Sequence, residues 1–416
     1  MPAHAIAERL ERFRRLNDPA VLWPEVTEPA FRRALEEIAR VSGAILSPPP
    51  DPPQPPQPLN LPTDVSPAAF GVAAFASGMG PLLGYWCETG RLRAADPLAE
   101  LLARHLDHGR RRAERLEGEL GRLLAAFGGR GIEVVLLKGA HTAYEYFPEP
   151  GTRPMADLDV LVSPAHLPAA RQVLGELGFV AINTEALPHR SDWARPDERT
   201  VRSIELDHVD NPWAIDLHVS LDRSYAPGVV ARFDGIDTGA GAVRRHFGRP
   251  ASVLPQPLLL AYLACHAADH LWSLPLLRLA ELVLVARRDI RARAAWAGLE
   301  DLLARTRTAR FAYPTLALAE RLVANTVPAD VLERLGRHAP RRLRRFVSRT
   351  APAAAQRLEP LGPGHAFWTA SLRERLTRLL HLVWPYGETG PLPARRAFSR
   401  QRDRLRRLLL RALKRG

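Results

Sequence analysis

The sequence has 416 residues, of which 46% are hydrophobic and 25% charged, and its formal net charge is +13. These values are typical of a soluble globular protein with room for two or three domains. Its two cysteines, Cys87 and Cys265, lie far apart and outside any CxxC spacing, which argues against a disulfide framework or a zinc site. This cysteine usage makes a reducing cytoplasm the expected location. No apolar stretch is long enough to cross a bilayer, so we expect no integral membrane segment, although binding to a membrane surface stays open.

The positive charge is concentrated at one end of the chain. Residues 341–416 hold 19 lysines and arginines against four acidic residues, whereas the residues before them have a net charge of −2. Only Lys138 and Lys414 among the 58 basic residues are lysines, a bias typical of a GC-rich genome, and we expect a bacterial protein. Lys138 is therefore expected where a compact ammonium is needed and a planar guanidinium would not serve.

The N-terminal third is predicted to be helical, with one interruption. Apolar residues recur at helical spacing in 3–16 and 28–43, which indicates an N-terminal helical region over 1–46. Ten of the 21 residues in 47–67 are proline, which favours a linker over the alternative, a ligand for a proline-recognising domain. A second helical region covers 68–129, with a long helix from Asp96 to Phe127 that ends at two glycines.

The next segment, 130–245, changes to an α+β pattern. A short apolar strand over Glu133–Leu137 leads to Gly139 and a helix-compatible stretch, and a second strand is predicted over Asp157–Val162. Ser163 is a suitable N-cap for a helix that runs to Leu177. Further strands are predicted over 179–182, 202–209 and 213–221, the last two as a hairpin.

The remaining chain reads as helical. The region 246–388 contains helical patterns over 258–271, 276–288, 294–304 and 312–324, and 389–416 is predicted to be a basic amphipathic tail. The predicted fold class is therefore α+β, with a small mixed sheet flanked by N- and C-terminal helical regions.

Paired aspartates are the most distinctive local feature. Asp157 and Asp159 are two apart in a predicted strand, so both side chains project to one face, while the residues between and after them enter the core. Two neighbouring carboxylates repel each other, and a hard cation such as Mg²⁺ relieves this repulsion. Asp216 in a later strand offers a third carboxylate. The alternative is that the pair lies on the solvent face of an edge strand.

Two basic residues surround this pair in the sequence. Lys138 stands at the end of the first buried strand, directly before Gly139 and a helix, an arrangement suited to holding an anion. Arg153 precedes the aspartates and is able to clamp phosphate oxygens. Both also have a simpler interpretation, as ion-pair partners of the same aspartates.

The run LLKGAHTAYEYFPEPGTRPMADLDVLVSPAHLPAARQVLGELGF, with AIDLHVSL downstream, resembles the bacterial nucleotidyltransferase-like family of the polymerase beta-type nucleotidyltransferase superfamily. The resemblance extends from about residue 78 to about residue 325. It implies Mg²⁺-dependent transfer of a nucleoside monophosphate from an NTP to a hydroxyl-type acceptor, a small molecule or peptide, with release of pyrophosphate. Two Mg²⁺ ions are expected with bound NTP.

The resemblance also implies roles for single residues. Lys138, Gly139 and Arg153 would bind the nucleotide phosphates, and Asp157 and Asp159 would bind the metal ions. Asp216 would be the third catalytic and metal-binding acid. His218 would complete the last motif and is a candidate residue of the cleft, without an assigned role. The sequence departs from the superfamily pattern because Lys138-Gly139 stands where glycine-serine is usual, and because the paired acids come later.

His266 and His270 lie four residues apart on a predicted helix, next to Asp269. They are able to face the cleft or to ligate a metal, but packing in the core or at a polar interface is the favoured interpretation.

The tail, Arg395–Arg415, holds ten basic residues among its leucines. It is able to lie on an anionic membrane surface, contact nucleic acid, dock on an acidic partner or remain solvated.

The favoured function is thus a nucleotidyltransferase that uses an NTP and an acceptor of unknown identity. The main alternative is a catalytically degenerate nucleotidyltransferase fold that binds a nucleotide or a partner, which the missing serine favours. A second alternative is a nucleic-acid-associated factor that binds through its basic tail. The sequence also predicts that replacing Asp157 or Asp159 by asparagine leaves the fold intact.

Overall fold

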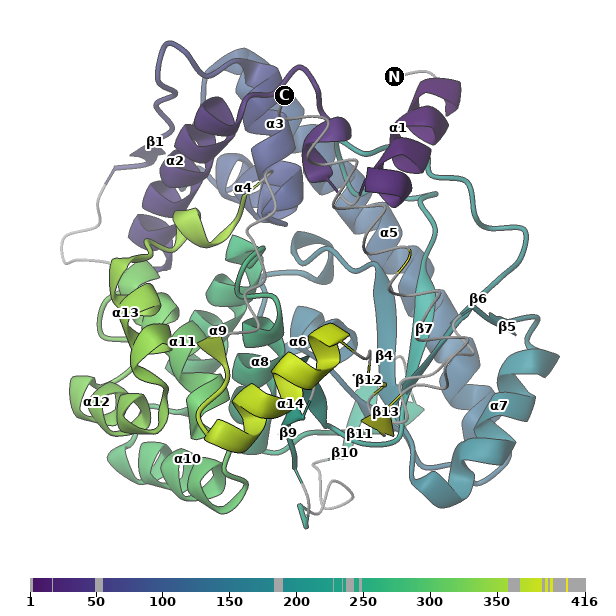
Figure 1. Ribbon diagram of the computed structural model, residues 1–416. Coiled ribbons are helices and arrows are strands. Elements are labelled where there is room, and N and C mark those ends of the chain that lie inside the picture. Colours follow the sequence, from purple (N-terminus) through teal and green to yellow (C-terminus); the bar gives the residue numbers. More distant parts are fainter. Residues whose placement is uncertain are drawn as a thin grey trace.

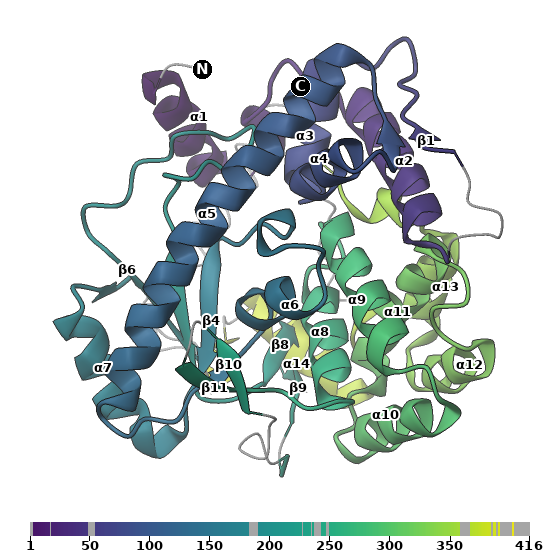
Figure 2. The same cartoon turned by 180° about the vertical axis from the view of Figure 1, so that it is seen from behind.

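The computed structural model describes residues 3–16, 18–48, 55–182, 190–226, 228–233, 235–236, 243–246, 249–357, 367–383, 386–387, 390–391 and 402. A mixed sheet of seven strands lies at its centre, with a long helix across one face and the C-terminal helices beside it (Figures 1 and 2). The α+β class predicted from the sequence is confirmed.

The N-terminal helices form where the helical spacing predicts them. Thr27 caps one of them by accepting a hydrogen bond from the Ala30 amide, and Pro29 stands in its first turn, where no amide donor is needed. Within the described residues these helices are α1 (Ala3–Leu16), α2 (Glu28–Leu46), α3 (Pro67–Ala76), α4 (Gly80–Glu88) and α5 (Asp96–Gly128).

The proline-rich segment is partly packed onto this helical region. Its residues Gln57–Pro58 form β1, which pairs in parallel with β2 (Leu92–Arg93). Leu59 and Val65 are buried against the neighbouring helices. Residues 49–54 lie outside the described part of the chain.

The central sheet places β4 and β7 side by side and parallel, with Asp159 opposite Asp216. Strand β3 pairs antiparallel with β4 on one side, and β6 pairs antiparallel with β7 on the other. Strands β11 and β3 are parallel, and the outer pairs are antiparallel. In spatial order the strands are β10 (Val243–His246), β11 (Arg249–Val253), β3 (Val135–Leu136), β4 (Asp157–Leu161), β7 (Ala214–His218), β6 (Arg190–Ala194) and β5 (Val180–Ala181).

One predicted strand is wrong. Residues 202–209 form a loop, and the antiparallel neighbour of β7 is β6, which the sequence did not predict. The loop is stable because side chains satisfy its backbone: the side-chain oxygen Oδ1 of Asn211 accepts hydrogen bonds from the amides of Arg202 and Ser203. The Trp23 indole donates to the Ile204 carbonyl. These local bonds replace the sheet pairing that the alternating pattern suggested.

Alternation along the strands separates an apolar face from a polar one. Leu158, Val160, Ile215 and Leu217 pack with leucines of α5, which crosses this face (Figure 2). Asp159, Asp216 and His218 alternate with them and therefore lie on the opposite face. Helix α6 (Gly139–Glu145) packs against β4, and its Ala140 and Ala143 lie in the same apolar cluster as Leu158 and Val160.

The C-terminal half is helical, and the four helices predicted between 258 and 324 are confirmed within a few residues. Helix α8 is buried along its whole length between α9, α10, α11 and the β8–β9 hairpin. The remaining elements are α7 (Leu167–Glu176), β8 (Arg223–Ala226), β9 (Val229–Ala231), α8 (Leu258–Asp269), α9 (Leu276–Asp289), α10 (Arg293–Arg305), α11 (Ala309–Leu322), α12 (Ala329–His338), α13 (Arg341–Arg349), α14 (Leu372–Val383), β12 (Tyr386–Gly387) and β13 (Gly390–Pro391).

Two predictions concern membranes and the tail. The amphipathic tail, 395–415, lies outside the described residues apart from Arg402. Among the described helices, no single one is both long and apolar enough to cross a membrane. Helices α3 and α4 reach that length and composition only as a pair, which is bent by 110°.

Close contact between α5 and the turn before β4 depends on two glycines. A Cβ atom on Gly109 of α5 would lie 2.3 Å from the Gly151 carbonyl oxygen, and one on Gly151 would lie 2.7 Å from the Arg110 Cα. Neither atom belongs to a flexible side chain, so the backbones would have to separate. This contact sets the position of the turn that leads to Arg153.

We predict that Gly109→Ala destabilises the protein by about 1–3 kcal/mol through this clash. Gly118→Ala on the same helix is the matched control, since nothing lies within 4 Å of its added methyl group. Alanine favours the helix, so Gly118→Ala should stabilise by about 0.5–1 kcal/mol. Denaturant unfolding followed by circular dichroism measures both changes, and an equal effect at the two positions would contradict the packing described here.

Candidate active site

Asp159 and Asp216 form the centre of the site. They are register partners on parallel strands and are only 2% and 6% exposed. With His218 at the end of β7, they offer three ligand atoms that lie within 4.8 Å of one another. A pair of buried carboxylates with one imidazole is a suitable set of donors for a divalent cation.

Asp159 has two cationic or donor partners of its own. The Lys138 ammonium contacts its Oδ1, and His218 Nε2 lies 3.0 Å from the same oxygen. Burial alone would raise the pKa of Asp159, but Lys138 and His218 outweigh burial and hold this pKa well below its usual range. Asp159 is therefore ionised in the folded protein.

Asp216 behaves in the opposite way. Burial, with the charges of Asp159 and Asp157, raises its pKa to about 8, although Arg190 Nη1 donates to its Oδ2 over 3.1 Å. The two central carboxylates are thus electrostatically unequal: Asp159 is held as an anion, while Asp216 retains a proton at neutral pH when no cation neutralises the pair.

The other predicted acid, Asp157, lies at the start of β4 opposite Ala214 and is half-buried. It is outside the group of three ligand atoms formed by Asp159, Asp216 and His218. Its charge still acts on Asp216. A further carboxylate, Asp192 of β6, is the register partner of Asp216 and was not predicted.

Lys138 and Gly139 form a tight junction between β3 and α6. Lys138 has a φ of 44°, a region that a non-glycine residue seldom adopts without support from its surroundings. A Cβ on Gly139 would lie 2.3 Å from Arg153 Nη1, so only glycine allows the guanidinium to pack there. The predicted Lys-Gly loop and Arg153 are thus in direct contact.

Arg153 is buried and is bound to a partner that the sequence did not suggest. Its Nε donates to Glu281 Oε1 over 2.8 Å, rather than to the aspartates. The Thr142 hydroxyl also donates to Glu281 and lies 2.9 Å from the Lys138 carbonyl. Among the described residues, Arg153 Nη2 is a buried nitrogen without a hydrogen-bond partner. Glu281 of α9 therefore ties the loop to the helical region.

The two predicted histidines lie beside the site but outside the group of ligand atoms. His266 is buried on α8, its Nδ1 contacts Arg223 Nη2, and its ring lies 5.6 Å from that of His270. Burial, followed by the charges of Lys138 and Arg223, holds the pKa of His266 well below its usual value, so neutral His266 accepts from Arg223. The carboxylate nearest to Arg223 in the described chain is Asp269, at 3.8 Å.

Arg112 of α5 positions the strands that carry the acids, and sequence reasoning missed it. Its guanidinium donates to the Met155 carbonyl before β4 and to the carbonyls of Asn211 and Pro212 before β7. No motif marks such a residue, because its role depends on three segments that meet only in the fold. The same applies to Arg223 and Glu281, whereas Arg190 and Asp192 become predictable once β6 is recognised as a strand.

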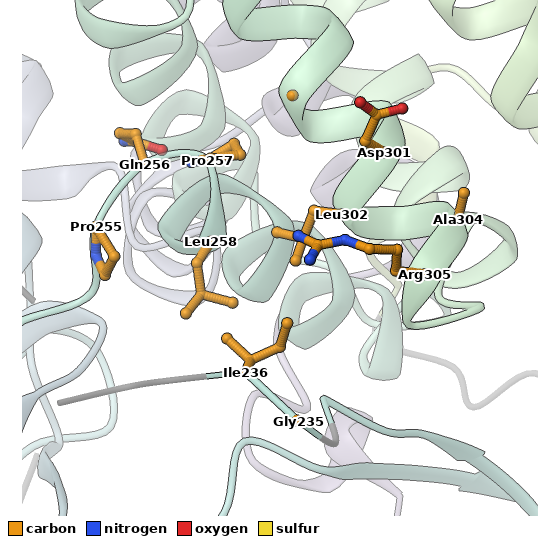
Figure 3. Close-up of a pocket in the computed structure, with 11 residues that line it drawn as sticks. Gly235, Ile236, Pro255, Gln256, Pro257, Leu258, Asp301, Leu302, Ala304 and Arg305 are labelled. Carbon is orange, nitrogen blue, oxygen red and sulfur yellow. The ribbon is translucent and has the colours of Figure 1, made fainter. Parts of the chain in front are cut away.

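A cavity of about 900 Å³ lies apart from these residues (Figure 3). It opens between the N-terminal end of α8, α10 and residues 235–236, and Asp301 and Arg305 supply its charged groups. His266 lies eight residues further along α8 than Leu258 of the cavity, or about 12 Å.

Comparison with known proteins identifies a family over more than half of the chain. Residues 66–324 match a family described as uncharacterised nucleotidyltransferase. No curated protein matches the sequence. The chain also resembles the solution structure of the antibiotic-resistance factor ANT(2'')-Ia, with 13% identity and a TM-score of 0.29 over 57% of this chain and 93% of that one.

We predict that Glu281→Gln destabilises the protein at neutral pH by about 3–5 kcal/mol, because it leaves Arg153 buried without a counter-ion. Burial would raise the pKa of Glu281, but Arg153 and Arg278 lower it to about 2, below its usual value of 4.5. A group with a lowered folded pKa stabilises fully above its unfolded pKa. Its contribution is therefore lost as the pH falls from 4.5 towards 2.

Unfolding free energies measured across this pH range should fall less steeply for Glu281→Gln than for the wild type. Glu333→Gln is the control, since Glu333 forms an ion pair with Arg337 in which both side chains are more than two-thirds exposed. That variant should change stability by less than about 1 kcal/mol. Equal acid sensitivity in Glu281→Gln and the wild type would show that this pair does not contribute as described.

Proposed function

Because the chain belongs to the uncharacterised nucleotidyltransferase family, we propose that it transfers a nucleoside monophosphate from an NTP to a hydroxyl-bearing acceptor. The observation that carries this proposal is the pair Asp159 and Asp216, buried side by side on β4 and β7 with Lys138 against it. Two carboxylates and one ammonium at a strand-to-helix junction are the groups that metal-assisted phosphoryl chemistry uses.

Asp159 and Asp216 would hold Mg²⁺, and Asp157, at the open end of β4, would complete the site when NTP binds with two ions. The donor set fits, because hard oxygen ligands predominate and the ligand atoms of Asp159, Asp216 and His218 already lie within 4.8 Å of one another. Bound Mg²⁺ would supply charge neutralisation for the triphosphate and activation of the acceptor hydroxyl. His218 would hold Asp159 in place through its hydrogen bond.

Lys138 would change its partner during binding. In the structure its ammonium contacts Asp159, a position in which it substitutes for a cation. A triphosphate offers it a second anion, and the Lys138 backbone is fixed by Thr142 and by the Arg153–Gly139 contact. Arg223 is a second buried cation whose nearest described carboxylate is beyond hydrogen-bond distance. Both would bind phosphate oxygens.

The reaction itself is an in-line displacement. The acceptor oxygen forms a bond to the α-phosphorus, and the bond from that phosphorus to the oxygen bridging to the β-phosphorus breaks, so pyrophosphate leaves. The proton of the acceptor hydroxyl passes to Asp216. Arg153 acts indirectly, because it is bound to Glu281 and shapes the loop that carries Lys138.

A second candidate is a nucleotidyltransferase fold that binds a nucleotide or partner without turnover. One observation favours it: Lys138 and Arg190 already contact Asp159 and Asp216, in positions that a bound cation would take. Nucleotide binding that does not depend on a divalent cation would support this alternative.

We predict that Asp216→Asn abolishes Mg²⁺-dependent NTP binding, weakening it by more than about 100-fold, and leaves the protein folded. This variant is preferable to Asp159→Asn, because Asp159 is the counter-ion of buried Lys138. Replacing Asp159 by asparagine would leave this ammonium buried without its counter-ion. The free energy of unfolding would then fall by on the order of 3 kcal/mol. For Asp159→Asn we therefore predict a loss of stability, in place of the unchanged fold expected from the sequence.

Isothermal titration with the four NTPs, with and without Mg²⁺, checks this prediction. Asp210→Asn is the matched control, because Asp210 is 60% exposed in a loop that leads to β7. It should bind NTP as the wild type does. A folded wild type that binds none of the four NTPs in the presence of Mg²⁺ would refute the proposed function.

A further inference from the structure

Helix α14 has its apolar side turned away from the protein. Its leucines are the most exposed large hydrophobic side chains in the described part of the chain, at 71% for Leu372, 50% for Leu376, 55% for Leu379 and 56% for Leu380. At about 100° per residue, all four lie within an arc of about 100° on one side of the helix. An amphipathic helix of a globular protein normally buries this side.

The opposite, polar side attaches α14 to the rest of the molecule. Glu374 accepts two hydrogen bonds from Arg310 of α11, at 2.7 and 3.2 Å, and both side chains are largely buried. Thr377 on the same side lies against Gly228, where an added Cβ would be 3.0 Å from the Thr377 methyl group. Figure 1 shows α14 running across the outside of the helical region, in front of α8. The leucines are therefore exposed because polar contacts hold the helix in this orientation.

Arginines border the leucine side on both edges. Arg373 and Arg375 are exposed, and each lies less than about 90° around the helix from the centre of the leucines. Long basic side chains at such positions reach outward past an apolar surface while their aliphatic stems cover it. This combination of an apolar centre and basic edges is typical of helices that lie in a membrane interface.

The net charge of the C-terminal part of the chain indicates the kind of partner. Residues 341–416 have 15 more basic than acidic residues, and α13 alone exposes five arginines: Arg341, Arg342, Arg344, Arg345 and Arg349. The 25 residues after β13 contain ten basic residues and a single acid. If this segment, or a second copy of α14, covered the leucines, arginines would be brought against arginines. An anionic lipid surface instead complements both the leucines and the charge.

We propose that α14 is an interfacial helix that binds an anionic lipid surface. The leucines enter the boundary between headgroups and acyl chains, and Arg373 and Arg375 contact lipid phosphates. The helix lies on the surface and does not cross the bilayer. This placement would hold the nucleotidyltransferase domain at a membrane face.

Vesicle flotation of the full-length protein tests the proposal. Wild type should float with vesicles of phosphatidylcholine mixed with phosphatidylglycerol, and not with phosphatidylcholine alone, and raised salt should weaken the binding. Leu376→Gln with Leu380→Gln should reduce the bound fraction at least about tenfold. Both positions are exposed and glutamine is a good helix former, so the fold should be retained. Arg373→Gln with Arg375→Gln should weaken binding as well.

The matched control is Val180→Gln with Ile182→Gln, which removes the other exposed large hydrophobic side chains of the described residues, at the β5 edge of the sheet. It should float as the wild type does. Undiminished flotation of the leucine variant would overturn the proposal, because the basic tail alone would then account for binding. A wild-type dimer in light scattering that the leucine variant converts to a monomer would also overturn it, since a second copy would then cover this side.

Discussion

Two carboxylates held in register on adjacent parallel strands are the constraint on which the rest of the site depends. Asp159 and Asp216 are buried neighbours, so each raises the electrostatic cost of ionising the other. The fold reduces this cost by surrounding them with cations from different elements: Lys138 from the loop after β3 and Arg190 from β6. Removing one carboxylate is therefore not equivalent to removing the other. Asp159 balances the charge of the buried Lys138 ammonium, whereas the folded protein disfavours ionisation of Asp216.

The position of Lys138 is determined by residues far away in the chain. Its left-handed backbone is followed by Gly139, which is small enough for Arg153 to pack against it. Arg153 is in turn bound to Glu281, 128 residues later. Strain at the residue that contacts Asp159 is thus supported by a buried ion pair on a separate helix. Through this pair, the C-terminal helices contribute to the geometry of the sheet domain as well as covering it.

The long helix α5 performs a second positioning role, on the other side of the sheet. Its leucines pack against β4 and β7, and Arg112 binds the carbonyl groups that precede both strands. A single guanidinium therefore fixes where β4 and β7 begin relative to each other. The parallel register that aligns Asp159 with Asp216 follows from these positions. A lysine at 112 would provide one point charge where a planar fork contacts several carbonyls.

Sequence reasoning succeeded where a single local pattern determines the structure. The apolar spacing and terminal glycines located α5 within a residue, and alternation located β4 and β7 with Asp159 and Asp216 on one face. It failed at 202–209, where alternation was present but Asn211 and Arg112 satisfy the backbone as a loop. It missed Glu281 and Arg223, because a buried partner supplied by another element leaves no mark in its own neighbourhood.

The distribution of charge along the chain can be read from the sequence, but its consequence requires the structure. A nearly neutral body and a basic C-terminus are compatible with any anionic partner. The orientation of α14 restricts the kind of anionic partner, because a helix whose polar side binds Arg310 must leave its leucines exposed to solvent. Arginines alone would serve a nucleic acid equally well, whereas exposed leucines between arginines fit an anionic lipid surface, which is apolar beneath its charge.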